Sequence, residues 1–217
     1  VVAAPSTLSS TMAVLAASAG GVGVRFARSR AGVGERGGRQ LSTDEALSLA
    51  TQILIAGVDT VVNFLSFFMI YLARHPEKVA EIRGDELKLR RGVEELFRRS
   101  PVVSEARMVA KDMTYRGVEL KHGDMILLPT VLHGLDEAEN ENPLDLDWER
   151  KNVNHATFGG GPHRCVGLHL ARLEATVTLQ EWVRHIPEFS LAPGAQPTYN
   201  SGIIASVQNV PLVWPTS

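Results

Sequence analysis

Residues 158–167 read Phe-Gly-Gly-Gly-Pro-His-Arg-Cys-Val-Gly, and this stretch contains the only cysteine of the chain, Cys165. The glycines predict a tight loop. The pattern that follows, from Val166 to about Ile186, predicts a helix that Pro187 ends. The loop therefore delivers a cysteine to the N-terminus of a helix, where the helix dipole and unpaired N–H groups favour a thiolate.

The loop alone leaves several kinds of chemistry open. A nucleophilic cysteine needs a base, for which His163 and His169 are the local candidates. A zinc site needs about four ligands, so Cys165 and these two histidines leave it short. A dinucleotide-binding loop fails because its last glycine is replaced by Arg164, and a phosphate-binding loop lacks its Gly-Lys-Ser/Thr end. A small buried cysteine beside a glycine turn is the structural alternative.

The amino-acid composition limits the kinds of partner that the chain can bind. The chain has 217 residues, with 22 basic and 24 acidic side chains and a formal net charge of -2. This balance argues against nucleic acid or an acidic membrane surface found through bulk charge. With 44% hydrophobic residues the chain can bury a core. A single cysteine excludes an internal disulfide and a cysteine-rich zinc module.

The first 33 residues differ from the rest. They are rich in Ala, Ser and Gly, begin at Val1, and precede the first acidic residue, Glu35. We interpret residues 1–33 as an atypical leader or a truncated upstream segment, with an organellar transit peptide as the alternative. Residues 34–217 then form one continuous domain segment.

A long apolar helix is predicted after this leader. Ser42 and Glu45 fit a capping box, residues 46–71 carry one charge, Asp59, and residues 74–76 (Arg-His-Pro) supply the stop. About 30 residues span about 45 Å. Such a helix lies inside a large protein or in a bilayer. An aspartate near its middle costs about 2.5 to 3.5 kcal/mol on insertion into a membrane, which favours the buried soluble helix.

The remaining pattern predicts short helices, a hairpin and a surface loop. We expect helices over Glu77 to Arg90 and Val93 to Arg99, a hairpin of residues 114–120 and 125–128 around Lys121 to Asp124, a long loop over 133–155, and short strands in the tail.

Three motifs in order resemble the cytochrome P-450 haem-thiolate monooxygenases. Residues 158–167 fit the family pattern F-G-x-G-x-[HR]-x-C-x-G, residues 56–60 (Ala-Gly-Val-Asp-Thr) resemble [AG]-G-x-[DE]-T, and residues 95–98 (Glu-Leu-Phe-Arg) resemble E-x-x-R. Arg150 stands where the family places an arginine that joins the last pair. The resemblance covers about Gly34 to Trp214 and is strongest to the bacterial camphor hydroxylase branch. It implies a mainly α fold with small β-sheets, as the C-terminal half of a cytochrome P-450 domain.

The resemblance implies haem b (iron protoporphyrin IX) as cofactor, with Cys165 as the axial ligand of the iron. A cysteine thiolate in this position pushes electron density toward O–O bond cleavage. The other residues that the resemblance places at the cofactor are Phe158, Gly159, Gly161, Gly167, His163, Arg107 and Glu105. Phe158 would exclude water from the sulfur, and the polar side chains would face the haem propionates.

The resemblance assigns proton delivery to Asp59 and stabilisation of activated oxygen to Thr60. A threonine hydroxyl that bonds back to the carbonyl four residues earlier can open a helix locally, and Gly57 makes this easier. The alternatives are an aspartate bonded to backbone and a plain core threonine.

The E-x-x-R residues carry a structural role in the family. Glu95, Arg98 and Arg150 would form a network behind the cysteine loop. The spacing also allows two ordinary surface pairs, Glu94 with Arg98 and Glu95 with Arg99.

The implied reaction is insertion of one oxygen atom of O2 into a small hydrophobic, terpenoid-like substrate, with electrons from an external ferredoxin. Pocket positions carried over from the camphor branch are Ile55, Val103, Ile203 and Ile204. Arg164 and Arg172 flank the loop where an acidic ferredoxin could dock. We expect a cytoplasmic enzyme with no membrane or nucleic-acid partner.

Two alternatives remain. The family's N-terminal half supplies the pocket roof, so the chain could be a truncated, non-catalytic haem-binding fragment. A membrane-anchored protein that uses the long helix is the other.

Overall fold

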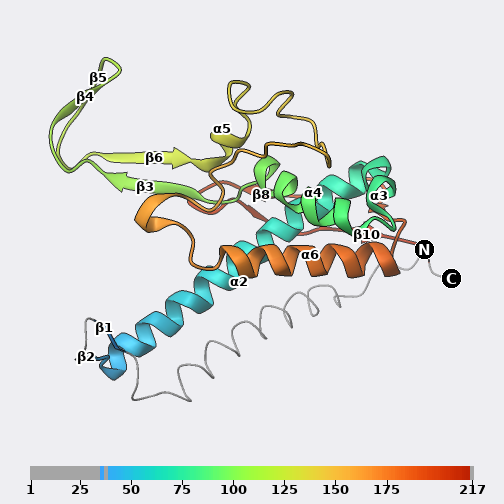
Figure 1. Ribbon diagram of the computed structural model, residues 1–217, viewed down its shortest axis with the longest axis horizontal. Helices are drawn as coiled ribbons and strands as arrows, with labels where there is room; N and C mark the ends of the chain where they lie inside the picture. Colours follow the sequence, from blue (N-terminus) through green and yellow to red (C-terminus); the bar gives the residue numbers. More distant parts are fainter. Residues whose placement is uncertain (1–34, 37–38, 216–217) are drawn as a thin grey trace.

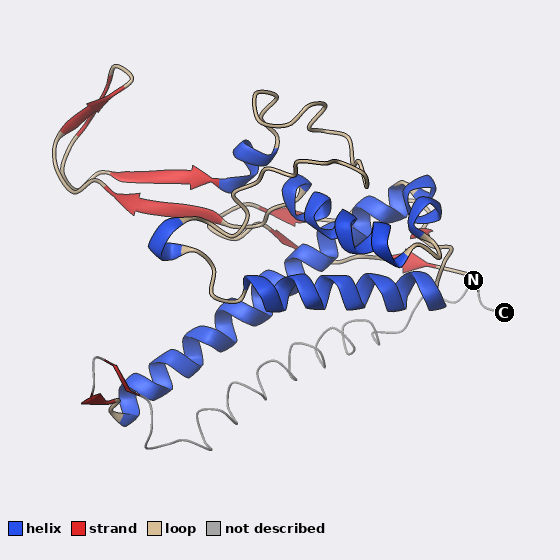
Figure 2. Ribbon diagram, viewed as in Figure 1, coloured by secondary structure: helices blue, strands red, loops and turns tan. Residues whose placement is uncertain are grey.

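The computed structural model describes residues 35–36 and 39–215, so the expectations about residues 1–33 lie outside the described residues. Helices dominate and the strands form five two-stranded sheets among these residues, as predicted (Figure 2). The elements are β1 (Glu35–Arg36), β2 (Arg39–Gln40), α2 (Thr43–Arg74), α3 (Pro76–Ile82), α4 (Glu86–Arg99), β3 (Ser104–Met108), β4 (Met113–Tyr115), β5 (Val118–Leu120), β6 (Met125–Pro129), α5 (Thr130–Gly134), the 3₁₀ turn η1 (Gly161–His163), α6 (Leu168–His185), β7 (Ser190–Leu191), β8 (Tyr199–Asn200), β9 (Ser206–Val207) and β10 (Leu212–Val213).

Helix α2 is the predicted long helix, with 32 residues. Ser42 caps it: the Ser42 hydroxyl accepts from the Glu45 N–H, and the Glu45 carboxylate accepts from the Ser42 N–H at 2.9 Å. The predicted capping box is therefore confirmed. The C-terminal part of the helix, from Asn63 to Ala73, carries its buried residues, whereas most of the N-terminal half is exposed.

The predicted boundary between the next two helices is wrong. The chain breaks at residues 83–85 rather than after Arg90, because Gly84 adopts a φ of 78° and Asp85 caps α4 by accepting from the Lys88 N–H. Gly92, which separated the predicted helices, lies inside α4 and packs directly against the Trp148 ring. A glycine there serves close packing and does not end the helix.

The predicted hairpin also has the wrong partners. Strand β4 pairs with β5 through a turn at Arg116 and Gly117, both with positive φ, and β6 pairs with β3. Residues 121–124 form a turn, in which Asp124 accepts from the Lys121 N–H, but the strands on its two sides do not pair with each other. The β3–β6 ribbon projects from the body and ends in the β4–β5 hairpin (Figure 1).

The predicted loop over 133–155 has no strand and overlaps only the end of α5. It is not purely a surface loop, because Asn140, Leu146 and Trp148 are buried. The tail after α6 forms the predicted short strands, which pair as β7–β10 and β8–β9.

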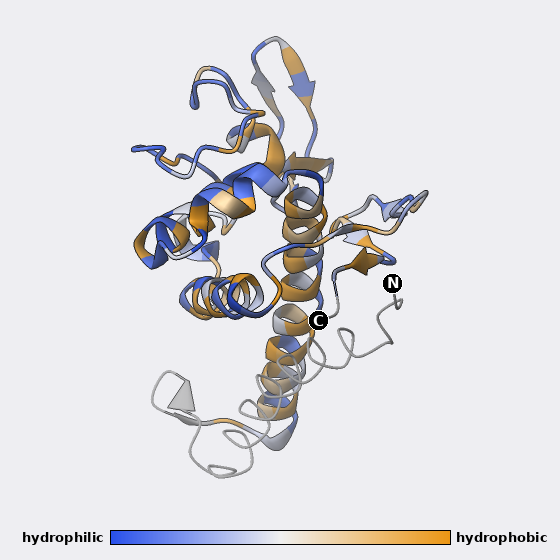
Figure 3. Ribbon diagram, turned by 90° about the vertical axis from the view of Figure 1, so that its right-hand side faces the viewer, coloured by the Kyte–Doolittle hydropathy of each residue, from blue (hydrophilic) through white to orange (hydrophobic). Residues whose placement is uncertain are grey.

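The core lies where α2, α4 and α6 meet (Figure 1). Its centre is aromatic: Phe64, Phe68, Phe97 and Phe158 contact one another with ring centroids 4.9 to 6.4 Å apart. Figure 3 shows that apolar residues of α2 continue into the half that stands clear of α4, α6 and the tail strands.

Candidate functional site

The cysteine loop is a tight turn whose backbone holds the thiol at the surface. Gly159 and Gly161 have φ angles of 64° and 59°, a region that other residues rarely adopt, which explains the glycines. The Cys165 N–H donates to the Phe158 carbonyl at 2.8 Å and closes the loop. Cys165 is exposed and lies two residues before Gly167, the N-cap of α6. The predicted placement of the cysteine just before a helix N-terminus is confirmed.

Strand β3 lies against the front of this loop. A Cβ on Gly159 would lie 2.5 Å from the Glu105 Oε1, so the carboxylate of Glu105 packs directly against the backbone of this glycine and would have to move for a larger residue. Arg107 pairs with Glu105 and donates to the Ala106 carbonyl. The structure thus brings Glu105 beside the loop and pairs Arg107 with it, while His163 is exposed within the loop, on η1.

Phe158 anchors the loop in the core. Its side chain is buried, and the centroid of its ring lies 4.9 Å from that of the Phe97 ring. The guanidinium of Arg172, a residue of α6, lies 4.9 Å from the centroid of the Phe158 ring. This is cation–π geometry. The first residue of the loop is therefore held by α4 and α6 together.

Glu94 on α4 completes that contact. Arg172 forms a bidentate ion pair with Glu94, with the Nε–Oε1 distance at 2.5 Å and the Nη2–Oε2 distance at 2.8 Å. His155 Nε2 lies 3.2 Å from Oε2, and the Thr157 nitrogen lies 3.3 Å from His155 Nδ1, so His155 hydrogen-bonds to Glu94 through Nε2–H. Burial by itself would raise the Glu94 pKa, but hydrogen bonds and charge from His155 and Arg172 lower that pKa from 4.5 to about 2. The Glu94 bond raises the Arg172 pKa.

This arrangement differs from one of the surface pairs that the spacing allows. Glu94 pairs with Arg172 across two helices and not with Arg98 along α4. Arg172 is half-buried and its charge is paired with Glu94, so it offers less positive potential to a ferredoxin. Arg164 is exposed.

Glu95, Arg98 and Arg150 do meet. The side chains of Arg98 and Glu95 are 0% and 1% exposed and form a bidentate ion pair, with Nε–Oε2 at 2.7 Å and Nη2–Oε1 at 2.8 Å. Arg150 Nε donates to Glu95 Oε1 at 2.9 Å. Arg98 also donates to the carbonyls of Gly134, Pro143 and Asp145, and Arg150 to the Glu141 carbonyl. The network therefore fastens the loop before residue 150 to α4.

On α2, Thr60 behaves as expected in one respect only. Its hydroxyl donates to the Ala56 carbonyl at 2.6 Å, but α2 remains helical through this turn, so the expected local opening is absent from the described helix. Asp59 Oδ1 accepts from Asn63 Nδ2 at 3.2 Å, and Asn63 Oδ1 accepts from the Val207 N–H. The buried Asn63 thus links Asp59 to β9.

Three of the four pocket residues lie together. Val103 forms a bridge with Ile204, and the Ser104 N–H donates to the Ile203 carbonyl at 2.7 Å. Ile55 lies on the N-terminal half of α2 and is 62% exposed, as Ile203 is at 64%. These residues present an uncovered apolar surface.

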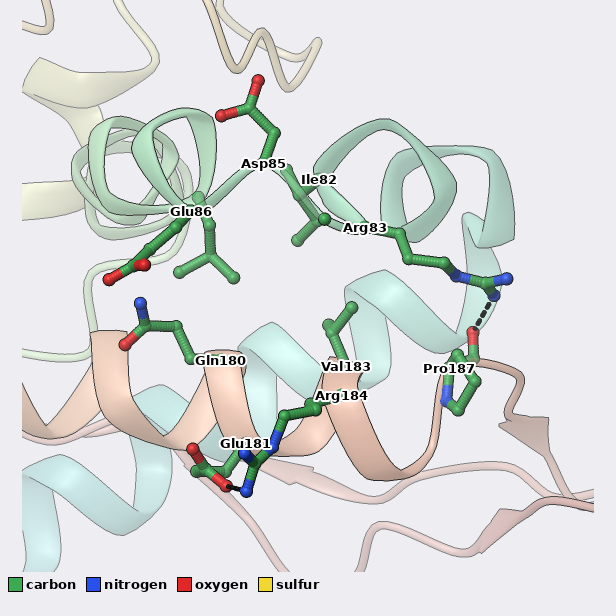
Figure 4. Close-up of a pocket in the computed structure, with 11 residues that line it drawn as sticks. Ile82, Arg83, Asp85, Glu86, Gln180, Glu181, Val183, Arg184 and Pro187 are labelled. Carbon is green, nitrogen blue, oxygen red and sulfur yellow. Dashed lines mark hydrogen bonds and ion pairs between the residues drawn. The ribbon is translucent and has the colours of Figure 1, made fainter.

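One of two cavities in the described part of the chain is lined by the cysteine loop, and the other lies away from it. One, of about 310 Å³, lies behind the cysteine loop and is lined by Glu94, His155, Phe158, Arg164 and Arg172 among others. A larger one, of about 640 Å³, lies between the α3–α4 turn and α6 (Figure 4). It contains none of the predicted site residues, and Arg83 and Arg184 at its rim already bind the Pro187 carbonyl and Glu181.

The donor set near Cys165 fits one kind of metal group. Within residues 35–36 and 39–215, no three His, Cys, Asp or Glu side chains gather as metal ligands, so the zinc alternative lacks its ligands. A single exposed thiol at a glycine-lined turn suits an iron that receives its other ligands from a porphyrin. The residues present thus fit a haem held through one thiolate.

Comparison with known proteins agrees with this class of haem-thiolate protein. The family model described as cytochrome P450 matches residues 26–202. The chain therefore belongs to the cytochrome P450 family.

Individual relatives support the assignment. The chain is 35% identical over 177 residues to a probable cytochrome P450 127A1 of Sinorhizobium fredii, covering 82% of this chain and 43% of the relative. It resembles the crystal structure of CYP101J2 with a TM-score of 0.80 and 45% identity, covering 84% of this chain and 47% of that one. It resembles the polyketide synthase cytochrome P450 PksS of Bacillus subtilis with a TM-score of 0.78 and 30% identity, covering 84% and 48%. The chain spans about half the length of the relatives that it matches.

Sequence reasoning missed the contacts of Glu94, His155 and Arg172. Glu94 and Arg172 are 78 residues apart, and no local period links them. The only signal was that Glu94 lies beside the motif glutamate and Arg172 one turn into the helix after the cysteine.

Proposed function

We propose that the chain supplies the cysteine-ligand half of a haem-thiolate monooxygenase, which inserts one oxygen atom of O2 into a small hydrophobic substrate. The observation that carries the proposal is Cys165, held exposed by a glycine turn whose first residue, Phe158, lies under the Arg172 of the Glu94–Arg172 pair. Haem b, bound through this thiolate, would supply the iron that activates O2. Gly159 and Gly161 allow the backbone to turn closely beside it, and Glu105, Arg107 and His163 would meet its propionate edge.

Asp59 and Thr60 are the proposed proton-handling residues. Asp59 accepts from Asn63, which is itself held by β9, so its carboxylate has a defined position on α2. The Thr60 hydroxyl can rotate from its bond to Ala56 and donate outward, because a helix carbonyl retains its own backbone partner. Together they could pass a proton toward oxygen at the exposed face of α2.

The substrate class follows from the uncovered residues. Ile55, Val103, Ile203 and Ile204 offer apolar contact and no charge, which suits a small hydrophobic molecule. The resemblance of the sequence motifs to the bacterial camphor hydroxylase branch supports a terpenoid-like substrate.

For the electron donor we propose a soluble ferredoxin, and for the location the cytoplasm. Arg164 is the exposed cation of the loop that an acidic partner could meet. Helix α2 is long and apolar enough to cross a membrane, and 39% of its most apolar window is buried in the protein. Its packing against α6 and the tail strands supports a core role rather than an anchor.

The experiment is oxygen labelling. The haem-loaded protein receives a surrogate ferredoxin system, a panel of small terpenoids and ¹⁸O2, and products are analysed by mass spectrometry. We expect one labelled oxygen atom in the product, and less product per O2 consumed for Asp59→Asn and Thr60→Ala. Products labelled only from water would contradict the proposal.

A second candidate is a haem-binding fragment without turnover. The exposure of Ile55 on α2 and of Ile203 favours it, because these two residues of the proposed pocket are uncovered. In that case the thiolate-haem spectrum forms, but no labelled product appears with any substrate.

A further inference from the structure

Two adjacent glutamates on α4 serve two separate ion-pair networks. Glu95 points to Arg98 and Arg150 and holds the loop before residue 150. Glu94 points to Arg172 and His155, on α6 and on the segment that enters the cysteine loop. The second network shares no side chain with the first, so its role needs a separate account.

The second network surrounds the anchor of the cysteine loop. The Arg172 guanidinium lies over the Phe158 ring at 4.9 Å, the His155 ring lies 6.0 Å from it, and the Thr157 hydroxyl donates to the Phe97 carbonyl. The Phe158 carbonyl in turn accepts from the Cys165 N–H. A path of direct contacts therefore runs from Glu94 through Arg172 and Phe158 to the backbone of the proposed iron ligand.

We propose that Glu94, Arg172 and His155 are positioning residues that fix Phe158 and thereby keep the Cys165 thiolate bound to the haem iron. The proposal rests on the function proposed above. Glu94 fixes both nitrogens of the guanidinium fork, so the flat face of Arg172 stays over the ring. Without Glu94 the arginine is free to turn to solvent, and the Phe158 ring loses the cation on that face.

The consequence concerns ligand loss rather than overall folding. Glu94 and Arg172 side chains are about one third exposed, at 30% and 29%, unlike the buried Glu95. Removing either one therefore leaves no fully buried unpaired charge, and we expect α4 and α6 to stay folded. The loop, however, samples positions in which the sulfur leaves the iron.

The test measures how long the thiolate–iron bond persists in the haem-loaded protein. The carbon-monoxide difference band of thiolate-ligated haem is followed in mild urea for the wild type, Glu94→Gln and Arg172→Gln, with Glu181→Gln on α6 as the exposed-pair control. We expect the band to decay roughly tenfold faster in both network variants, the change that loss of one charge-assisted hydrogen bond produces. The control should decay at the wild-type rate. Arg172→Lys, which keeps the charge but lacks the fork, should fall between.

A double-mutant cycle separates positioning from general destabilisation. Phe158→Leu, Arg172→Gln and the double variant are compared by the same decay rate and by the urea midpoint of circular dichroism. If Arg172 acts through Phe158, the second change adds little to the decay rate once the first is present. Additive effects, or decay rates that follow the urea midpoint alone, would overturn the proposal.

The outcomes also separate this proposal from the proposed function. If the wild type never shows a thiolate-haem band, the proposed function fails. If the wild type shows the band and both network variants keep it as long as Glu181→Gln, only the positioning role fails.

Discussion

At the scale of single residues, the strongest constraint is the buried charge of Glu95. Its carboxylate has contacts with both Arg98 and Arg150, and the Glu95–Arg98 pair is almost fully hidden from water. Removal of one partner from a buried ion pair costs about 3 to 5 kcal/mol, because the other charges remain buried without compensation. The network therefore tolerates no loss of Glu95.

The first prediction concerns this residue. Glu95→Ala should lower the free energy of unfolding by about 3 to 5 kcal/mol and abolish stable haem uptake. Glu86→Ala is the matched control on the same helix, since Glu86 forms an exposed pair with Arg90 that water screens, and its removal should leave the stability almost unchanged. Hemin titration and urea unfolding measure both quantities. Normal haem uptake by Glu95→Ala would refute the structural role.

The second prediction concerns Glu94 and pH. Since the folded state lowers its pKa to about 2, Glu94 adds stability that is full above its ordinary value of 4.5 and is lost as the pH falls toward 2. The difference in unfolding free energy between wild type and Glu94→Gln should therefore shrink from pH 7 to pH 3. The difference for Arg172→Gln should also shrink over the same interval, because Glu94 without its arginine partner binds a proton at higher pH than in the wild type. Urea titrations at several pH values test this, and a constant difference would be the contrary result.

At the scale of elements, two glycines inside helices differ in how much space surrounds them. Gly92 lies inside α4, where a Cβ would come within 1.8 Å of the Trp148 ring. Gly57 lies inside α2, where a Cβ would meet nothing within 4 Å. The same substitution should therefore have opposite signs in the two helices.

The third prediction uses this pair. Gly92→Ala should destabilise the protein by about 1 to 3 kcal/mol through overpacking against Trp148. Gly57→Ala should raise stability by up to about 1 kcal/mol, because alanine has the higher helix propensity. Thermal and urea unfolding check both variants. Equal effects of the two substitutions would show that the α4–Trp148 contact is looser than described.

The elements also show where sequence reasoning succeeds. The α2 bounds follow from local signals, since the Ser42 cap and the stop at Pro76 act within a few residues. The break at Gly84 was missed because the apolar pattern continued across it, and the β3–β6 pairing was missed because a turn at Arg116 lies inside a run that resembled one strand. The meeting of Glu95 with Arg150, 55 residues away, could be expected only from the family resemblance.

At the scale of the whole molecule, the uncovered apolar surface is the main feature. The N-terminal half of α2 exposes Leu47, Leu49, Ile53, Leu54 and Ile55, and α6 exposes Leu170, Leu173 and Val177. Burial of such surface is worth about 25 cal/mol per Å². A body with these faces in water should lower its free energy by covering them.

The fourth prediction follows from that surface. The 217-residue chain by itself should self-associate at micromolar concentration, and Leu49→Glu combined with Ile53→Glu should shift it toward monomer. Gln52→Glu is the control, since it adds a charge to the same exposed part of α2 without removing apolar area. Sedimentation velocity reports the outcome. A wild-type chain that stays monomeric would contradict the prediction.

The central claim of the account is that the Cys165 sulfur bonds the iron of a haem. The most direct measurement is the carbon-monoxide difference spectrum of the reduced, hemin-loaded protein, compared with Cys165→His. The account predicts the band of thiolate-ligated haem in the wild type and, in Cys165→His, the band of imidazole-ligated haem or no bound haem. A wild type that binds no haem, or a thiolate band that survives the substitution, would contradict it.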